Sequence, residues 1–426
     1  MSSRVLRNIL KPVVIRGMVA REWWQSGVTY NPLSPAVYTD PYPTYERLRE
    51  KDPVHWSPLM DSWVFSRYKH IDSILRDHKR FSNDSSKRGN PSHIDDSLDV
   101  ANQPSMLFRD PPVHTRLRAL VSRAFTPAVI EGLAGRIRAV ADDLLDQIED
   151  PSRFDLMEAI AAPLPVIVIA ELLGVPSEDR PQFQIWSRHR SRGLEPNITD
   201  KERLLVAESG RELDQYFMGI IEQRRQEPQE DLISGLVAAE EEGDKLSQPE
   251  LLAMLRLLLI AGNETTTKLI GNGMLALLRN PEQMELLRQS PDLMPTAIEE
   301  LLRYDAPVQL DVRVALEDAE FEGREVKKGQ GITVLLGSAN RDPEMFSEPN
   351  RLNLARQEGS HISFGRGIHH CLGASLARLE GRLTFEALME RFSDIRTQAE
   401  QPVFRDNIIL RGLDVLPVSA RKAALN

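Results

Sequence analysis

The sequence FGRGIHHCLG, residues 364–373, carries the most structural information in the chain, and an apolar helical pattern follows it from about Ala374. Its glycines let the backbone approach a flat partner closely and turn N–H groups toward the sulfur of Cys371. The start of the next helix adds a positive end to the same place. The pattern therefore favours a thiolate at Cys371 over a thiol.

A thiolate in such a loop can serve as a nucleophile, as a zinc ligand or as the axial ligand of haem iron. Zinc can in principle use His361, His369, His370 and Cys371, but adjacent histidines do not easily converge on one ion. A nucleophilic cysteine needs a histidine base and an orienting group, and the pattern singles out no such partner. A buried, unreactive cysteine is the remaining interpretation of the loop taken alone.

Composition narrows the class of protein. Cys371 is the only cysteine among 426 residues, which excludes an intramolecular disulfide and any site built from several cysteines. A chain with one cysteine suits a reducing compartment, so we expect a cytoplasmic protein. The net charge is −10, from 53 basic and 63 acidic residues, and this argues against a nucleic-acid partner, which needs a basic surface.

A long helix is predicted in the middle of the chain. Ser247 and Glu250 form a capping box and Pro281 blocks continuation, which gives about 33 residues. The first half is rich in leucine on nearly every face, so we expect burial all round. The sequence AGNETTT, residues 261–267, interrupts it at the midpoint. Because a carboxylate is costly in a buried stretch, Glu264 indicates either a polar functional site at a local bend or a structural kink with a solvated glutamate.

The remaining pattern predicts a mainly α fold with a minor β portion, in one domain from residue 31 to residue 426. A β-hairpin is expected from residues 54–56 and 63–65, and further strands only at 312–316, 331–336 and near 407–416. The polar residues 84–105 predict a long loop.

Residues 1–30 are expected to form a basic, amphipathic N-terminal extension. Arg4, Arg7 and Lys11 share a helical face beside an apolar stripe. This pattern is typical of a helix that makes weak contact with a membrane surface through residues 1–22, or of a helix packed against the body.

Four motifs, in order along the chain, resemble those of the cytochromes P450, particularly the bacterial ones. The pattern Phe-Gly-x-Gly-x-His-x-Cys-x-Gly at 364–373 resembles the haem-binding loop of that family. The sequence AGNETT at 261–266 resembles its acid–alcohol pair, ELLR at 300–303 its Glu-x-x-Arg pair, and DPPVHTRLR at 110–118 its propionate-contacting helix. The resemblance implies a long central helix over a haem.

The resemblance also implies roles for single residues. Cys371 becomes the iron ligand of haem b, with Phe364 and Gly365 against the cofactor. The cationic partners of the propionates are expected to be His114, Arg118, Arg313 and His369, while Glu264 and Thr265 relay protons for oxygen activation. Glu300, Arg303 and Arg356 form a buried structural cluster. The expected substrate contacts are Leu257, Leu258, Ala261, Val308 and Leu310.

These roles predict a monooxygenase that inserts one atom of O₂ into a lipophilic small molecule such as a fatty acid, steroid, terpenoid or macrolide-like compound. Electrons are expected from a separate ferredoxin or flavodoxin-type protein. A basic cluster, Arg188, His189, Arg190 and Arg192, either attracts a substrate carboxylate or is a solvated face. The alternatives are a peroxide-driven peroxygenase of the same fold, a thiolate-haem binding protein without turnover, and a cysteine hydrolase.

Overall fold

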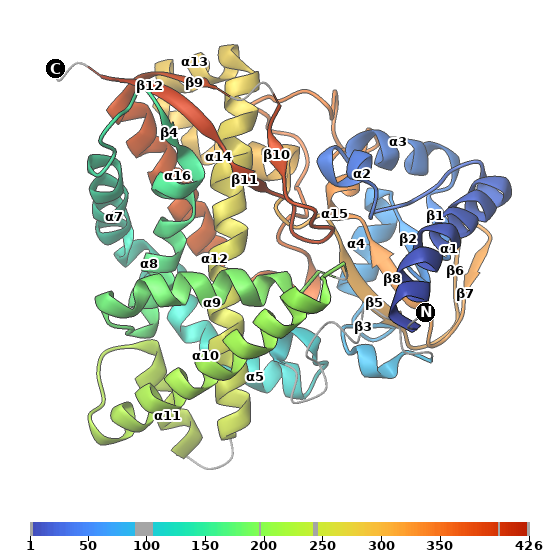
Figure 1. Cartoon of the computed structure of the whole chain (residues 1–426), viewed down its shortest axis with the longest axis horizontal. Helices are drawn as coiled ribbons and strands as arrows, with labels where there is room; N and C mark the ends of the chain where they lie inside the picture. Colours follow the sequence, from blue (N-terminus) through green and yellow to red (C-terminus); the bar gives the residue numbers. More distant parts are fainter. Residues whose placement is uncertain (1–2, 90–104, 196, 242–245, 399–400, 424–426) are drawn as a thin grey trace.

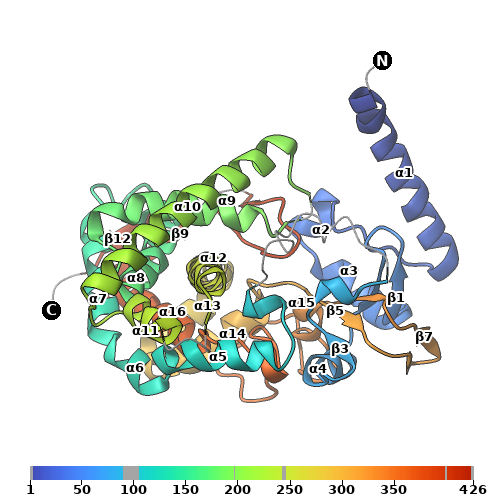
Figure 2. The same cartoon turned by 90° about the horizontal axis from the view of Figure 1, so that it is seen from below.

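The computed structural model describes residues 3–89, 105–195, 197–241, 246–398 and 401–423, with side chains from residue 14 onward, and is organised around helix α12, Gln248–Arg279. Figure 1 shows α12 running through the molecule, and Figure 2 shows it end-on with other helices around it. The predicted central helix is confirmed.

Local chemistry sets the ends of α12. The backbone N–H of Ser247 donates to Glu250 Oε2 at 2.9 Å, as the capping box requires. At the other end Pro281 opens the next helix, α13. Burial all round was expected for the leucine-rich first half of α12, and this was wrong, because Leu252, Leu257 and Ile260 are only half-buried. The stretch in which nearly every side chain is buried is Asn263–Leu277, in the second half.

The other helices surround α12 on one side and support the sheet on the other (Figure 2). Helices α8 and α16 contact α12 directly, and α16 also packs on α7 and α14, which together make the main hydrophobic core. The helices are α1 Ser3–Ser26, α2 Pro35–Thr39, α3 Tyr42–Lys51, α4 Tyr68–Arg76, α5 Val113–Ser122, α6 Pro127–Gly132, α7 Ala134–Asp146, α8 Pro163–Leu173, α9 Arg180–Arg192, α10 Asp200–Gln226, α11 Leu232–Glu241, α13 Pro281–Gln289, α14 Met294–Tyr304, α15 Leu336–Ala339 and α16 Ala374–Arg391.

The β portion consists of one five-stranded sheet and smaller ones. The larger sheet has the order β1-β2-β8-β5-β3, with β2 and β8 parallel and the other pairs antiparallel. Its strands are β1 Val54–Ser57, β2 Ser62–Phe65, β8 Gly331–Val334, β5 Asp311–Ala315 and β3 Phe81–Ser82. The smaller sheets contain β4 Phe154–Asp155, β12 Pro417–Lys422, β9 Phe392–Thr397, β6 Ala319–Phe321, β7 Arg324–Val326, β10 Val403–Phe404 and β11 Leu413–Val415.

The predicted strands are correct for the larger sheet and incomplete elsewhere. The hairpin forms with Trp56 opposite Trp63, and the strands expected at 312–316 and 331–336 are β5 and β8. In the region 407–416 only β11 is a strand. The prediction that no other strands follow was wrong, because β9 pairs with β12, and such pairing between distant segments leaves little local signal. Most of the predicted loop 84–105 lies outside the described residues.

Candidate active site

The cysteine loop has the tight shape that its glycines predict. Cys371 lies between a short 3₁₀ turn, Gly367–His369, and α16, and its backbone N–H donates to the carbonyl oxygen of Phe364 at 2.8 Å. Gly365 and Gly367 have φ values of 68° and 67°, in the left-handed region that favours glycine. A Cβ on Gly367 would also collide with the backbone carbonyl of Leu75. The loop therefore cannot form with a larger residue at 367.

The thiol of Cys371 has a raised pKa in the polypeptide. Burial raises it most, while the N–H of Gly373 and the charges of Arg118 and Arg378 act in the opposite direction. In the polypeptide alone, the dipoles and charges of the loop do not offset this desolvation. Cys371 lines a cavity, so a cation bound there can supply the positive charge that lowers the pKa of the thiol.

This cavity, of about 460 Å³, lies between the cysteine loop and α12. All five residues predicted to contact substrate line it, from α12 and from the segment after α14: Leu257, Leu258, Ala261, Val308 and Leu310. Other apolar lining residues were not predicted, because they come from distant segments: Met106, Ile169, Leu194, Val206 and Ile409. The cavity therefore has a largely apolar wall facing the sulfur.

One edge of the cavity gathers basic side chains. The rings of His114 and His369 have centroids 4.2 Å apart, and both nitrogens of His114 and Nε2 of His369 are buried without a hydrogen-bond partner. Burial and the nearby charges of Arg313 and His114 lower the pKa of His369 to about 3. Arg118 donates to the carbonyl oxygen of His370 at 2.6 Å. These donors converge from α5, β5 and the cysteine loop.

Such an edge fits the propionates of a haem. Buried donors without partners and clustered positive charge need an anionic ligand, and two carboxylates supply one. The thiol of Cys371 lines the same cavity and is of the type that can bind a metal. Arg313 differs from the others, because it pairs with Asp311 at 2.8 Å in this structure. The residues present therefore fit the cofactor that the resemblance implies.

The acid and the alcohol of α12 lie in different surroundings. Thr265 lines the cavity, and its hydroxyl donates to the carbonyl oxygen of Ala261 at 2.8 Å. Glu264 is not a lining residue, since its carboxylate contacts Lys268 Nζ at 2.5 Å and lies 3.8 Å from Arg405. Although burial acts to raise the pKa of Glu264, the charges of Lys268 and Arg405 bring it below its ordinary value. The resting pair is therefore not a direct acid–alcohol contact.

Two charged residues near Glu264 and Thr265 were not predicted from the sequence as part of the site. Lys268 is one helical turn after Glu264 in an apolar rod, which is the signal that could have revealed it. Glu380, on α16, lines the cavity, and neither of its carboxylate oxygens has a hydrogen-bond partner. Burial raises the pKa of Glu380 to about 8, with the nearby Thr266 hydroxyl acting in the opposite direction. Burial therefore favours the protonated form of Glu380.

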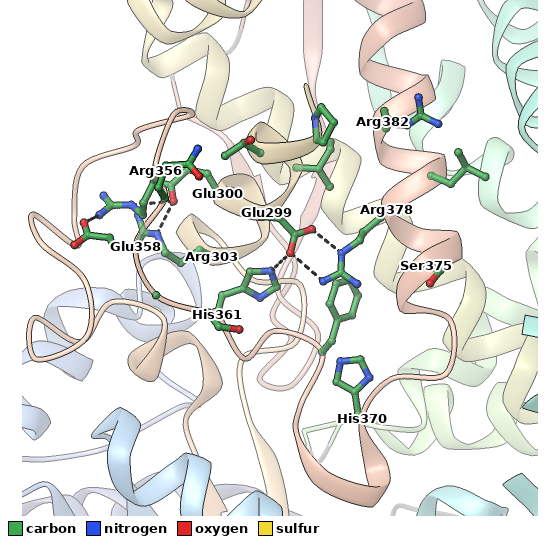
Figure 3. A pocket seen from close by; sticks show the side chains of 18 of the residues that line it. Glu299, Glu300, Arg303, Arg356, Glu358, His361, His370, Ser375, Arg378 and Arg382 are labelled. Carbon is green, nitrogen blue, oxygen red and sulfur yellow. Dashed lines mark hydrogen bonds and ion pairs between the residues drawn. The ribbon is translucent and has the colours of Figure 1, made fainter. Parts of the chain in front are cut away.

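Figure 3 shows the cluster around Glu300 on the other side of the cysteine loop. Arg303 makes two bonds to the carboxylate of Glu300, at 2.7 and 2.8 Å, and Arg356 adds a third at 3.1 Å. Glu300 and Arg303 are fully buried. The remaining nitrogen of Arg303 donates to the carbonyl oxygens of Asn340 and Pro349. The structure thus joins the three residues in one saturated network.

A groove of about 680 Å³ runs beside this cluster (Figure 3). It is lined by Arg366, Arg378 and Arg382 among others, and Glu299 binds both Arg378 and His361 there. Phe364 and His370 line both the groove and the cavity. A thin wall of side chains therefore separates the groove from the sulfur.

The basic cluster on α9 is divided between several surroundings. Only Arg190 of the four lines the cavity, together with Arg256 of α12, which pairs with Asp214 at 3.0 Å. His189 binds Ser209, and Arg192 binds Glu202. Arg188 is exposed. The four residues therefore do not form one anion site.

A family model described as "Cytochrome P450" matches residues 54–412. The chain is 43% identical, over 92% of its length and 99% of the relative's, to "Polyketide biosynthesis cytochrome P450 PksS" of Bacillus subtilis. It is 40% identical, over 91% of its length and 95% of the relative's, to "Vitamin D(3) 25-hydroxylase" of Pseudonocardia autotrophica.

A solved structure of P450BioI bound to an acyl carrier protein that carries hexadec-9Z-enoic acid superposes with a TM-score of 0.84. The two are 34% identical, and the match covers 90% of this chain and 99% of that one.

Proposed function

The chain belongs to the cytochrome P450 family of haem b monooxygenases, and we propose that it oxidises a lipophilic small molecule held in the cavity between Thr265 and Cys371. The oxidation places one oxygen atom of O₂ into a C–H or C=C bond. The observation that carries this proposal is the largely apolar wall that faces the sulfur.

Each group of the site has a part in binding the cofactor. Cys371 would hold the iron, and His114, His369 and Arg118 would bind the propionates, with Arg313 released from Asp311 as a fourth donor. The bound haem supplies oxygen activation, to which the thiolate contributes electron density. The partnerless nitrogens of His114 support this assignment, because haem carboxylates would remove their desolvation cost.

Two residues of α12, Glu264 and Thr265, are assigned to proton transfer. The Thr265 hydroxyl donates to Ala261, so its oxygen lone pairs face the cavity and can accept a hydrogen bond there. Glu264, tied to Lys268 and near the partly exposed Arg405, connects this region with solvent. We infer that Glu264 takes up protons on the Arg405 side and passes them toward Thr265 by a change of rotamer. Burial of this region limits water entry.

The substrate is expected to be largely apolar, such as a fatty acid, steroid, terpenoid or macrolide-like compound. Relatives named for polyketide biosynthesis and for vitamin D hydroxylation support that range. A substrate bound by an acyl carrier protein is included in it, because one structural neighbour was solved with such a partner.

A spectral titration tests the proposal. Compounds from each class are added to the purified holoprotein, and a true substrate should shift the Soret band and then give an oxygenated product with NAD(P)H, a reductase and ferredoxin. Ala261→Phe fills the cavity and should abolish the shift while the carbon monoxide spectrum persists. Leu204→Phe, at an exposed position of α10, is the matched control.

Three results would contradict the proposal. Product formed with peroxide but not with electron donors would identify a peroxygenase. Binding without product across the panel would identify a haem-binding protein. An unchanged titration in Ala261→Phe would place the substrate elsewhere.

We infer that the electron donor, a ferredoxin or flavodoxin-type protein, docks on the groove, because Phe364 and His370 line both the groove and the cavity. Arg382→Glu should slow reduction by ferredoxin severalfold, since exposed charges govern association. Arg396→Glu, the same change at a more exposed position on β9, should not. Reduction by dithionite is the control. Equal slowing with dithionite would mean a damaged haem site, and no slowing would exclude Arg382 from docking.

A further inference from the structure

Helix α1 lies outside the part of the chain that matches the family. The match begins at residue 54, whereas α1 ends at Ser26. Figure 2 shows α1 projecting beside the sheet, away from the helices that surround α12. The function of α1 therefore cannot be deduced from the monooxygenase reaction.

One face of α1 packs against the rest of the protein. Ile15, Met18 and Val19 are half-buried, and Glu22 is fully buried, which is the spacing of a single helical stripe. The carboxylate of Glu22 binds His55 Nε2 at 2.6 Å, and His55 Nδ1 binds Asp52 at 2.9 Å. This buried cluster holds the end of α1 in a fixed orientation on β1.

The opposite face of α1 exposes large apolar side chains. Trp24 is 82% exposed, Trp23 is 63% exposed and Val14 is 51% exposed. Adjacent tryptophans with that exposure are unusual, because each leaves a large apolar area in water. In the sequence before them stand further apolar residues, from Val5 to Val13.

Basic side chains share this outer surface, because Arg16 and Arg21 are exposed. Arg4, Arg7 and Lys11 precede them in the sequence, at the spacing that continues the stripe of Ile15, Met18 and Glu22. Glu22 is the only acidic residue among residues 1–26, and it is turned inward to His55. The whole chain, in contrast, has a net charge of −10. Positive charge is therefore concentrated on α1 against an acidic body.

We propose that the outer face of α1 binds the surface of an anionic phospholipid bilayer. Tryptophan prefers the headgroup region, where its ring is apolar and its N–H is hydrated, and clustered Lys and Arg are attracted to anionic lipids. An acidic protein would satisfy the charges but would leave the adjacent tryptophans without a reason to be exposed. No helix within the described residues is long and apolar enough to cross a bilayer, so α1 lies at the surface.

Vesicle sedimentation of the full-length holoprotein tests the proposal. The protein should sediment with vesicles of phosphatidylcholine mixed with phosphatidylglycerol, stay in solution with pure phosphatidylcholine, and be released by salt. Arg16→Gln with Arg21→Gln should weaken binding by roughly tenfold. Trp23→Ser with Trp24→Ser should weaken it at any salt concentration.

Matched variants separate α1 from the general surface. Arg351→Gln with Arg396→Gln removes two exposed charges elsewhere, and Leu204→Ser removes an exposed apolar side chain, so neither should change sedimentation. All variants should keep the carbon monoxide spectrum of the native protein. Equal loss in the matched variants, or no sedimentation at all, would overturn the proposal.

Two further outcomes would replace the bilayer with another partner. Light scattering that shows a dimer lost in the tryptophan variants, without lipid binding, would mean that α1 binds a second copy. Binding to an acidic carrier protein or ferredoxin through Arg16 and Arg21, without lipid binding, would mean a protein partner.

Discussion

Two buried ion pairs of the same kind, Glu300–Arg303 on α14 and Glu264–Lys268 on α12, differ in the donors that hold the carboxylate. The carboxylate of Glu300 accepts four hydrogen bonds, from Arg303 twice, from Arg356 and from the N–H of Asn353. The carboxylate of Glu264 interacts with Lys268 and with the hydroxyl of Ser191, and Arg405 lies 3.8 Å away. Two arginines bind the first carboxylate directly, whereas a single lysine binds the second.

The difference shows how similar pairs become structural or functional. A saturated network has no low-energy alternative, so it fixes the segments that meet at Arg303. A pair in which a single lysine binds the carboxylate can exchange partners at lower cost, and Arg405, which is 26% exposed, offers a route to solvent. Sequence spacing, i to i+3 or i to i+4, does not distinguish the two cases.

The largest effect is expected from breaking the saturated pair. Arg303→Ala leaves Glu300 buried with fewer partners and removes the bonds to Asn340 and Pro349, so the free energy of unfolding should fall by about 5 kcal/mol. Little holoprotein should accumulate. Arg351→Ala, in an exposed pair with Glu348, should cost less than about 0.5 kcal/mol. Denaturant unfolding measures both, and similar losses would remove the distinction between the two pairs.

Glu380 extends the comparison, because no cation pairs with it among the residues that the structure describes. With its pKa raised to about 8, folded Glu380 keeps a proton that the unfolded chain releases above about pH 4.5. The free energy of unfolding should therefore fall as pH rises from about 5 to about 8, by at most about 1.4 kcal/mol per pH unit.

Glu380→Gln should remove that slope and make the protein more stable near pH 8. Urea unfolding across this range measures the difference between native protein and variant. Glu348→Gln, at an exposed carboxylate, is the control and should leave the slope unchanged. A slope that survives in Glu380→Gln would show that Glu380 is ionised in the folded protein.

A double-mutant cycle tests the pair on α12. Glu264→Gln leaves Lys268 buried without a carboxylate, so it should lower both stability and turnover. Adding Lys268→Gln should restore much of the stability, because no charge remains, while turnover stays at least about tenfold low for want of the acid. Native turnover in the double variant would refute the proton role of Glu264.

Lys268→Gln alone gives a separate readout. The charge of Lys268 is the main influence that lowers the pKa of Glu264, so its removal should raise that pKa. The acid side of the pH–rate profile should then move to higher pH. An unmoved profile would mean that Lys268 does not set the protonation of Glu264.

Much of the fold followed from local sequence. The ends of α12 are set by Ser247, Glu250 and Pro281, which act within one helical turn, and the cysteine loop by glycines at Gly365 and Gly367. The sheet of β9 and β12 could not be predicted in this way. Its strands belong to segments that meet only when the domain has folded.

The sequence was sufficient to predict which residues form the site, but not how the side chain of Glu264 is oriented in it. The residues expected to line the cavity do so, since the face of a helix follows from its spacing. The orientation of Glu264 depends on Lys268 and on Arg405 from a distant segment, which spacing alone does not fix. The raised pKa of Cys371 has the same origin, because burial is a property of the assembled structure.

The smallest effect is expected from alanine substitutions at two threonines of α12. Thr265→Ala removes the hydroxyl that lines the cavity, so electrons should be diverted to hydrogen peroxide and the ratio of product to NAD(P)H consumed should fall severalfold. Thr267→Ala removes a buried hydroxyl bonded to Asn263, at 3.3 Å, and should cost about 1 kcal/mol of stability with normal coupling. Peroxide and product are measured in parallel with bound substrate in both variants. Because both threonines lie in the same stretch of helix, a general loosening of α12 would uncouple both, whereas a role for the cavity hydroxyl predicts uncoupling in Thr265→Ala alone.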